Sequence, residues 1–135
     1  MIVADANLVA YFAVRDERSQ FADAVFEVDP VWAAPVLWRS EFCNVLAKYV
    51  QHAGMSMEAA LAALRSAEEV IDAREYRVSS EKVLRLVMQS KCTAYDCEYV
   101  ALAQDLNVSL VTTDKQVLRE FPKIAVSQEQ FAKKN

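Results

Sequence analysis

The sequence is short of glycine and histidine, on which many cofactor and metal sites depend. Its 135 residues include one glycine, Gly54, and one histidine, His52. A single glycine excludes phosphate-binding loops that need several, such as the P-loop and the dinucleotide-binding motif. A single histidine excludes zinc sites built on clustered histidines, and a catalytic triad would have to use His52 as its base. Nucleotide cofactors held by glycine-rich loops are therefore not expected.

A long apolar segment and paired cysteines are also missing. The longest wholly apolar stretch, residues 31–38, contains a proline and falls far short of the roughly 20 residues that span a bilayer. The N-terminus has no basic segment ahead of an apolar one and reaches Asp5 at once, which argues against a secretory signal. Cys43, Cys92 and Cys97 are odd in number, so reduced thiols are expected. We expect a cytoplasmic protein without a membrane helix.

The composition favours a globular chain. Hydrophobic residues make up 54% and charged residues 25%, a balance that can build a packed core. The length is close to the commonest size of one domain, so we expect a single domain over residues 1–135. The formal net charge is -4, which does not suit a nonspecific binder of polyanions, and any contact with nucleic acid must be local.

Short apolar runs alternate with segments of helical periodicity. Strands are predicted at residues 1–4, 31–34, 76–78, 109–113 and 124–126. Helices are predicted from Leu8, over residues 19–27, 36–51, 56–70 and 93–105, from residue 79, after Asp114 and at the C-terminus. This alternation predicts an α/β fold with a mainly parallel sheet covered by helices on both faces.

Two aspartates follow predicted strands directly. Asp5 comes after residues 1–4, and Asp114 comes after residues 109–113. In an α/β sheet, ligands collect outside the carboxyl ends of the strands, which makes both residues candidates for a binding site. The alternative is that aspartate simply favours such positions as a turn or cap residue.

Two further acids lie on the apolar sides of predicted helices. Glu41 has Leu37, Trp38 and Val45 one helical turn away. A solvated glutamate is not expected in that neighbourhood. The alternative is an acid at the edge of the core that reaches water or is hydrogen-bonded.

Asp96 is the second such acid. It has Tyr99 and Val100 on its side of the helix, whereas Glu98 and Asp105 are expected on the opposite, solvent-exposed side. The alternative is structural, because Thr93 and Asp96 have the spacing of a capping box at the start of a helix.

Both helices are expected to begin at the edge of the sheet where Asp5 and Asp114 follow their strands. Clustered carboxylates repel one another unless a cation compensates them. Oxygen ligands without histidine or cysteine suit hard ions, here Mg²⁺ or Mn²⁺. Without these four acids the acidic and basic side chains would balance in number. A pair of divalent ions is a common apparatus for displacement at phosphorus, so the pattern predicts phosphodiester hydrolysis.

These residues resemble the PIN-domain ribonucleases, and among them the VapC-type toxins of toxin–antitoxin pairs. The resemblance covers nearly the whole chain and is carried by four segments in order: Asp5-Ala6-Asn7, Glu41 within residues 38–47, residues 93–103 around Tyr95-Asp96, and Leu110-Val111-Thr112-Thr113-Asp114-Lys115.

The resemblance implies a three-layer α/β/α nuclease that cuts RNA with one or two Mg²⁺ or Mn²⁺ ions and is inhibited by an antitoxin. It assigns metal binding and catalysis to Asp5, Glu41, Asp96 and Asp114. It gives Asn7 and Thr112 supporting roles, although relatives often have serine or threonine at the position of Asn7. It also favours a homodimer or partner-helix contact at the hairpin formed by residues 36–51 and 56–70, for which internal packing is the alternative.

RNA entering an acidic site needs basic residues at its rim. Lys115, Arg39 and Arg15 are closest in sequence to the proposed acids, although they could also be ordinary surface charges. Three rival functions remain: an aspartyl-phosphate phosphatase, which usually has a second aspartate where this chain has Asn7; a phospho-accepting receiver, which needs adjacent acids that are not evident; and a catalytically silent PIN-like scaffold.

Overall fold

A computed structural model describes residues 1–133 of the chain. Its centre is a five-stranded sheet in which every neighbouring pair is parallel, in the order β3-β2-β1-β4-β5. The strands are β1 (Ile2–Ala4), β2 (Trp32–Pro35), β3 (Glu75–Tyr76), β4 (Leu110–Thr112) and β5 (Ala125–Ser127). The prediction of a parallel sheet is confirmed.

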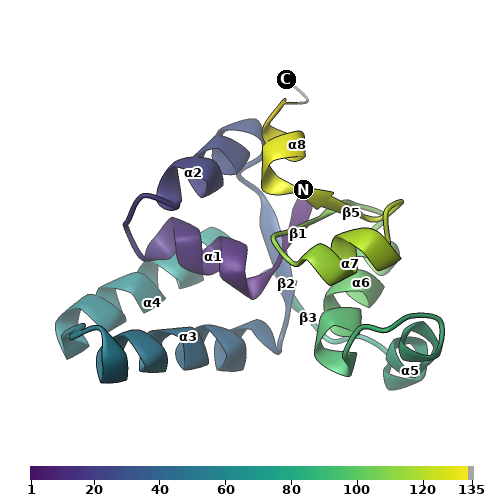
Figure 1. Ribbon diagram of the computed structural model, residues 1–135, viewed down its shortest axis with the longest axis horizontal. Coiled ribbons are helices and arrows are strands. Elements are labelled where there is room, and N and C mark those ends of the chain that lie inside the picture. Colours follow the sequence, from purple (N-terminus) through teal and green to yellow (C-terminus); the bar gives the residue numbers. More distant parts are fainter. Residues whose placement is uncertain (134–135) are drawn as a thin grey trace.

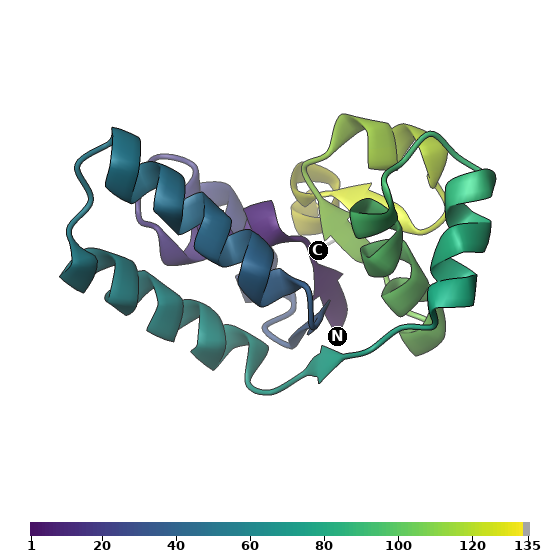
Figure 2. The ribbon, with the colours of Figure 1, turned by 90° about the horizontal axis from the view of Figure 1, so that it is seen from below.

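In the described part of the chain, eight helices cover the two faces of this sheet (Figure 1). They are α1 (Ala6–Ala13), α2 (Ser19–Val28), α3 (Trp38–His52), α4 (Met57–Ile71), α5 (Ser80–Met88), α6 (Ala94–Leu106), α7 (Lys115–Glu120) and α8 (Gln128–Lys133). Figure 2 shows α3 and α4 as a hairpin on one side of β1, with α5 and α6 on the other. The three-layer α/β/α architecture implied by the resemblance is confirmed.

Alternation along the strands divides the core into two layers. Ile2 and Ala4 of β1 pack with side chains of α1 to α4, whereas Val3 packs with side chains of α5, α6 and α7. Likewise, Val111 belongs to the first layer and Leu110 to the second. Both faces of β1 and β4 are therefore buried, which explains why these strands are continuous apolar runs in the sequence.

Several predicted boundaries are wrong by one or two residues. The first helix begins at Ala6 rather than Leu8, because Asp5 already caps it. Pro35 does not open a helix as predicted: it ends β2, where it pairs with Tyr76, and α3 begins at Trp38. The third strand is shorter and earlier than predicted.

The loop between α3 and α4 reverses the chain sharply. Gly54 has a φ of +70°, a left-handed conformation that glycine adopts without strain. The three cysteines carry free thiols. Within residues 1–133, none of the helices is long and apolar enough to cross a membrane.

Candidate active site

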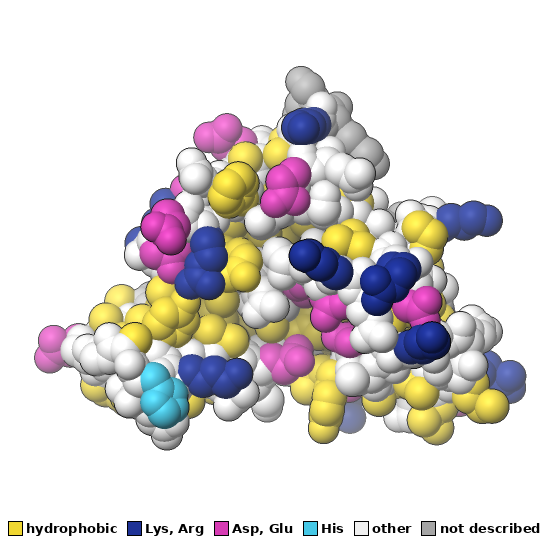
Figure 3. Space-filling view, in the orientation of Figure 1, with side chains coloured by type: hydrophobic (Ala, Val, Ile, Leu, Met, Phe, Trp, Pro, Cys, Tyr) yellow, Lys and Arg dark blue, Asp and Glu magenta, His cyan; other side chains and the backbone are white. Residues whose placement is uncertain are grey.

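A pocket of about 190 Å³ opens at the carboxyl ends of β1 and β4, between α3, α6 and α7. Figure 3 shows acidic side chains around this hollow on the face of the molecule. All four acids predicted from the sequence line it: Asp5, Glu41, Asp96 and Asp114. The other lining residues are uncharged, and none of the described residues that line the pocket is a lysine, arginine or histidine.

Asp5 is fixed by hydrogen bonds to both of its carboxylate oxygens. Oδ1 accepts from the Leu8 backbone N–H at 2.7 Å, which caps α1. Oδ2 accepts from the Thr112 hydroxyl and from the Thr113 backbone N–H at 3.1 Å. The cap expected as the alternative role of Asp5 is therefore present, and it coexists with the place of this carboxylate in the pocket.

Thr112 connects Asp5 to Asp114. Its hydroxyl donates to Asp5 and accepts from the Asp114 backbone N–H at 3.0 Å. Asp114 in turn caps α7, because its Oδ1 accepts from the Val117 backbone N–H at 3.0 Å. Since Thr112 ends β4 and Asp5 follows β1, the pairing of these two strands sets the spacing of the two acids.

Glu41 is positioned by a residue that the sequence analysis did not single out. The hydroxyl of Tyr99, a buried side chain on α6, donates a hydrogen bond to Glu41 Oε1 at 2.7 Å. Glu41 is thus hydrogen-bonded at the edge of the core, as its alternative role required, while also lining the pocket. The available signal was a phenol three residues after Asp96, on the same side of its helix.

Asp96 lies in the first turn of α6. Thr93 caps this helix, because its hydroxyl oxygen accepts from the Asp96 backbone N–H at 3.1 Å. Half of the expected capping box is therefore observed, and the half-buried Asp96 side chain lines the pocket. Glu98 is only partly exposed, contrary to expectation, and burial raises the pKa of its carboxyl.

The electrostatics of the pocket oppose ionisation. Burial is the main cause that raises the pKa of Asp5, Glu41 and Asp96 above their ordinary values. Neighbouring carboxylates add to this: Asp114 raises the pKa of both Asp5 and Asp96, and Asp96 and Asp5 raise that of Glu41. The hydrogen bonds from Thr112 and Tyr99 act in the other direction but do not cancel the rise.

The donor set fits a hard divalent cation. It offers four carboxylates and no soft ligand, and a positive ion would relieve their mutual repulsion. Within residues 1–133, no three acidic, cysteine or histidine side chains are close enough to hold one ion together without movement. Mg²⁺ commonly keeps several waters and binds through one or two carboxylates, so the spacing remains compatible with it.

The other predicted site residues have varied positions. Asn7 is exposed and lines the pocket. Lys115, at the start of α7, is also exposed but is not among the lining residues. Arg15 and Arg39 are absent from the lining. Asn44, which the sequence analysis did not name, lines the pocket one helical turn beyond Glu41, a spacing that could have indicated it.

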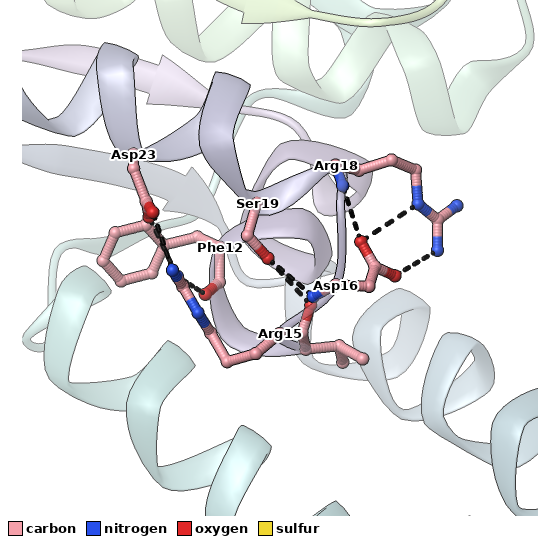
Figure 4. Close-up of polar contacts among 7 residues, drawn as sticks. Phe12, Arg15, Asp16, Arg18, Ser19 and Asp23 are labelled. Atoms are coloured by element: carbon pink, nitrogen blue, oxygen red, sulfur yellow. Dashed lines mark hydrogen bonds and ion pairs between the residues drawn. The ribbon is translucent and has the colours of Figure 1, made fainter.

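Both arginines have carboxylate partners elsewhere. Arg15 forms a double ion pair with Asp23, at 2.9 and 2.7 Å, and also donates to the Phe12 carbonyl (Figure 4). Arg39 pairs with Glu68 at 2.6 Å and with Glu75 at 2.8 Å. These guanidinium groups would have to share or exchange their carboxylate partners in order to bind RNA. The structure does not test the RNA contacts expected of Arg15 and Arg39 from the sequence.

Comparisons with known proteins identify the family. A model of the PIN domain matches residues 2–124. A protein named Ribonuclease VapC3, from Pyrobaculum aerophilum, is 27% identical over 124 residues, which cover 90% of this chain and 95% of the relative. The crystal structure of PAE2754 from Pyrobaculum aerophilum superposes with a TM-score of 0.75 at 23% identity, covering 98% of this chain and 94% of the other. The chain belongs to the PIN-domain family.

Proposed function

We propose that this PIN-domain protein is a divalent-metal-dependent endoribonuclease that hydrolyses RNA phosphodiester bonds, and that it is the toxin of a type II toxin–antitoxin pair. The observation that carries the proposal is the gathering of four carboxylates in one pocket at the carboxyl edge of the sheet, with no cationic side chain among the described residues that line it. The name of the relative Ribonuclease VapC3 supports RNA as the substrate and a toxin as the biological role.

In this proposal Asp5, Glu41, Asp96 and Asp114 hold one or two Mg²⁺ or Mn²⁺ ions. The chemistry that such ions supply is activation of a water molecule and stabilisation of the leaving oxygen. Other side chains orient the ligands: Thr112 fixes Asp5 and the backbone of Asp114, and Tyr99 fixes Glu41. In the same proposal Lys115, which is exposed and next to Asp114 in the chain, binds a phosphate of the RNA.

The rival enzyme class has less support. An aspartyl-phosphate phosphatase needs an acid two residues after its first aspartate, and the amide of Asn7 cannot donate a proton in that role. A PIN-like scaffold without catalytic activity would not need four buried or half-buried carboxylates that repel one another. We therefore favour the nuclease.

Several parts of the proposal concern partners and boundaries. A cognate antitoxin, a homodimer and a cytoplasmic location stay predictions. The single domain predicted over residues 1–135 includes residues 134–135, which lie outside the described residues. The α3–α4 hairpin buries Leu46, Ala60, Ala63 and Ala67, which satisfies the alternative of internal packing without testing a partner contact.

Cleavage assays with two aspartate variants of α6 test the proposal. The wild type should cut single-stranded RNA in Mn²⁺ or Mg²⁺ and stop in EDTA. Asp96→Asn should keep the fold and cut about a hundredfold more slowly or worse, because it removes one of the four proposed ligands. Asp105→Asn, on the exposed side of the same helix, is the control and should cut at the wild-type rate. Equal rates for Asp96→Asn and the wild type, or cleavage that survives EDTA, would contradict the proposal.

A further inference from the structure

A second hollow adjoins the acidic pocket and continues along α3. It is lined by Asn7, Val45, Lys48, Tyr49 and Ala53, and Asn7 and Val45 line the acidic pocket as well. We call it the α3 groove. Because the two hollows share lining residues, a chain that lies across the acids can continue into this groove.

The groove presents a cation at the point where the acidic pocket ends. Lys48 is exposed and forms no ion pair with any of residues 1–133. It lies two helical turns after Glu41, about 10 Å farther along the helix axis, on the same side of α3. An ammonium group there is suited to a backbone phosphate next to the one held at the acids.

The groove also presents an aromatic ring that is held in place. The hydroxyl of the half-buried Tyr49 accepts a hydrogen bond from Arg18, which follows α1. The guanidinium of Arg18 lies 4.7 Å from the centroid of the Tyr11 ring and pairs with Asp16, the pair drawn in Figure 4. These contacts tie the Tyr49 ring to two other segments. A fixed ring beside a cation that has no ion pair among residues 1–133 is typical of sites that stack an unpaired base.

We propose that the α3 groove binds single-stranded RNA on one side of the cleaved bond, with Lys48 on a backbone phosphate and the Tyr49 ring against a base. The proposal rests on the function proposed above. RNA is favoured over a protein segment for two reasons. The groove is continuous with a pocket suited to a phosphodiester, and it offers the exposed cation of Lys48 rather than a purely apolar surface. Stacking on Tyr49 requires an unpaired base, so single strands should bind better than duplexes.

Fluorescence anisotropy with a labelled single-stranded RNA tests the role of Lys48. The protein carries Asp96→Asn so that the RNA stays intact. Adding Lys48→Gln should weaken binding about five- to tenfold and reduce the slope of log Kd against log salt by about 0.7, the value for one lost phosphate contact with a single strand. Arg65→Gln removes the same charge from the exposed face of α4, away from both hollows, and should change neither quantity.

Two variants of Tyr49 test the ring. Tyr49→Phe loses the bond to Arg18 that orients the ring but keeps the ring itself, and should bind RNA only about two- to threefold more weakly than the parent. Tyr49→Leu should bind about tenfold more weakly to the single strand and lose much of the preference over duplex RNA. Melting temperatures of both variants separate a lost contact from a lost fold.

Equal RNA affinity for Lys48→Gln and Arg65→Gln would overturn the groove assignment, as would equal RNA affinity for folded Tyr49→Leu and Tyr49→Phe. A third contrary result would be that the Lys48 and Tyr49 variants bind RNA as the parent does but bind an antitoxin protein more weakly. Failure of the wild type to cut RNA in Mn²⁺ would instead overturn the proposed function. Normal cleavage by the wild type with equal Lys48→Gln and Arg65→Gln affinities would overturn the groove alone.

Discussion

Acidic side chains occur in two opposite settings in this protein. On the surface around α1 and α2, carboxylates face arginines. The hydrogen bond from Arg18 is the main cause that lowers the pKa of Asp16, and the one from Arg15 has the same effect on Asp23. These carboxylates are neutralised by the chain itself.

In the acidic pocket the same residue type meets carboxylates rather than cations. Burial, followed by like charges, raises the pKa of Asp5, Glu41 and Asp96. No basic side chain among the described residues that line the pocket compensates them. The comparison teaches that, among the described residues, the carboxylates around α1 and α2 are neutralised within the chain and those of the acidic pocket are not. Under the proposed function an external cation neutralises the pocket, and each prediction below alters one side of this contrast.

Placing a cation inside the pocket should have the largest effect. Asn44→Lys adds an ammonium one turn from Glu41, where a unit charge at about 6 Å interacts with about 3 kcal/mol at an effective dielectric of 20. We expect Mn²⁺ affinity and RNA cleavage to fall about a hundredfold or more. Manganese titration followed by electron paramagnetic resonance measures the affinity.

The matched control for this substitution is Gln51→Lys, which adds the same charge to the exposed end of α3 outside the pocket. It should leave Mn²⁺ affinity within about twofold of the wild type at moderate salt, because exposed charges are screened. Unchanged affinity in Asn44→Lys would place the ion somewhere other than among these four acids.

Removing the hydrogen bond to Glu41 should have a smaller effect. Tyr99→Phe keeps the buried ring but leaves Glu41 Oε1 without its donor. Loss of such an orienting contact commonly weakens metal binding 10- to 100-fold, so we expect about tenfold weaker Mn²⁺ binding. Tyr95→Phe removes a hydroxyl from a tyrosine on the same helix that is 61% exposed, and should leave the affinity unchanged. Equal affinities in the two variants would mean that Tyr99 only fills space.

Much of the fold could be predicted from apolar runs and helical periodicity in the sequence. The errors arise where contacts between distant segments decide the structure. The apolar runs at β1 and β4, and the helical stripe of α3, identify their elements because burial decides them. The start of α3 was predicted wrongly because Pro35 fits both the first turn of a helix and the end of a strand. Only the pairing of Pro35 with Tyr76 of β3 decides between these two positions.

The four acids could be predicted because strand exits and helix faces can be followed in a sequence. Their orienting contacts could not, because they join distant residues. Tyr99 and Glu41 are 58 positions apart, and Thr112 and Asp5 are 107 apart. In the same way, the pairing of Arg39 with Glu68 and Glu75 depends on the α3–α4 hairpin and β3, so closeness to Glu41 in the sequence did not indicate its neighbours in space.

Two aspartates on α6 should respond with opposite signs when the metal-free protein is unfolded. The raised pKa of Asp96 means that the folded state holds its proton more tightly than the unfolded chain, so stability is lost as pH rises above the ordinary value of 3.8 towards neutrality. Asp96→Asn should therefore be more stable than the wild type in EDTA at pH 7, and its stability should fall less as pH rises.

The paired partner in this comparison is Asp105, which forms an ion pair with Lys82 at 2.5 Å. Asp105→Asn should be less stable than the wild type by about 0.2 to 1 kcal/mol. Urea unfolding in EDTA between pH 4 and 8 measures both. Destabilisation of the metal-free protein by Asp96→Asn at pH 7 would contradict the raised pKa of Asp96 and the repulsion among the pocket carboxylates.

The smallest effect is expected at the arginine that already has two carboxylate partners. Arg39→Gln should lower the free energy of unfolding by about 0.5 kcal/mol, and this effect should shrink at high salt. The same substitution should change the KM for RNA less than about twofold, because the charge of Arg39 is already compensated by Glu68 and Glu75. Lys115→Gln removes a charge that forms no ion pair with residues 1–133 and should raise KM several-fold without changing kcat. Equal rises in KM for Arg39→Gln and Lys115→Gln would mean that RNA displaces Glu68 and Glu75 from Arg39. Ion pairing in the free protein would then not determine which basic side chains bind the substrate.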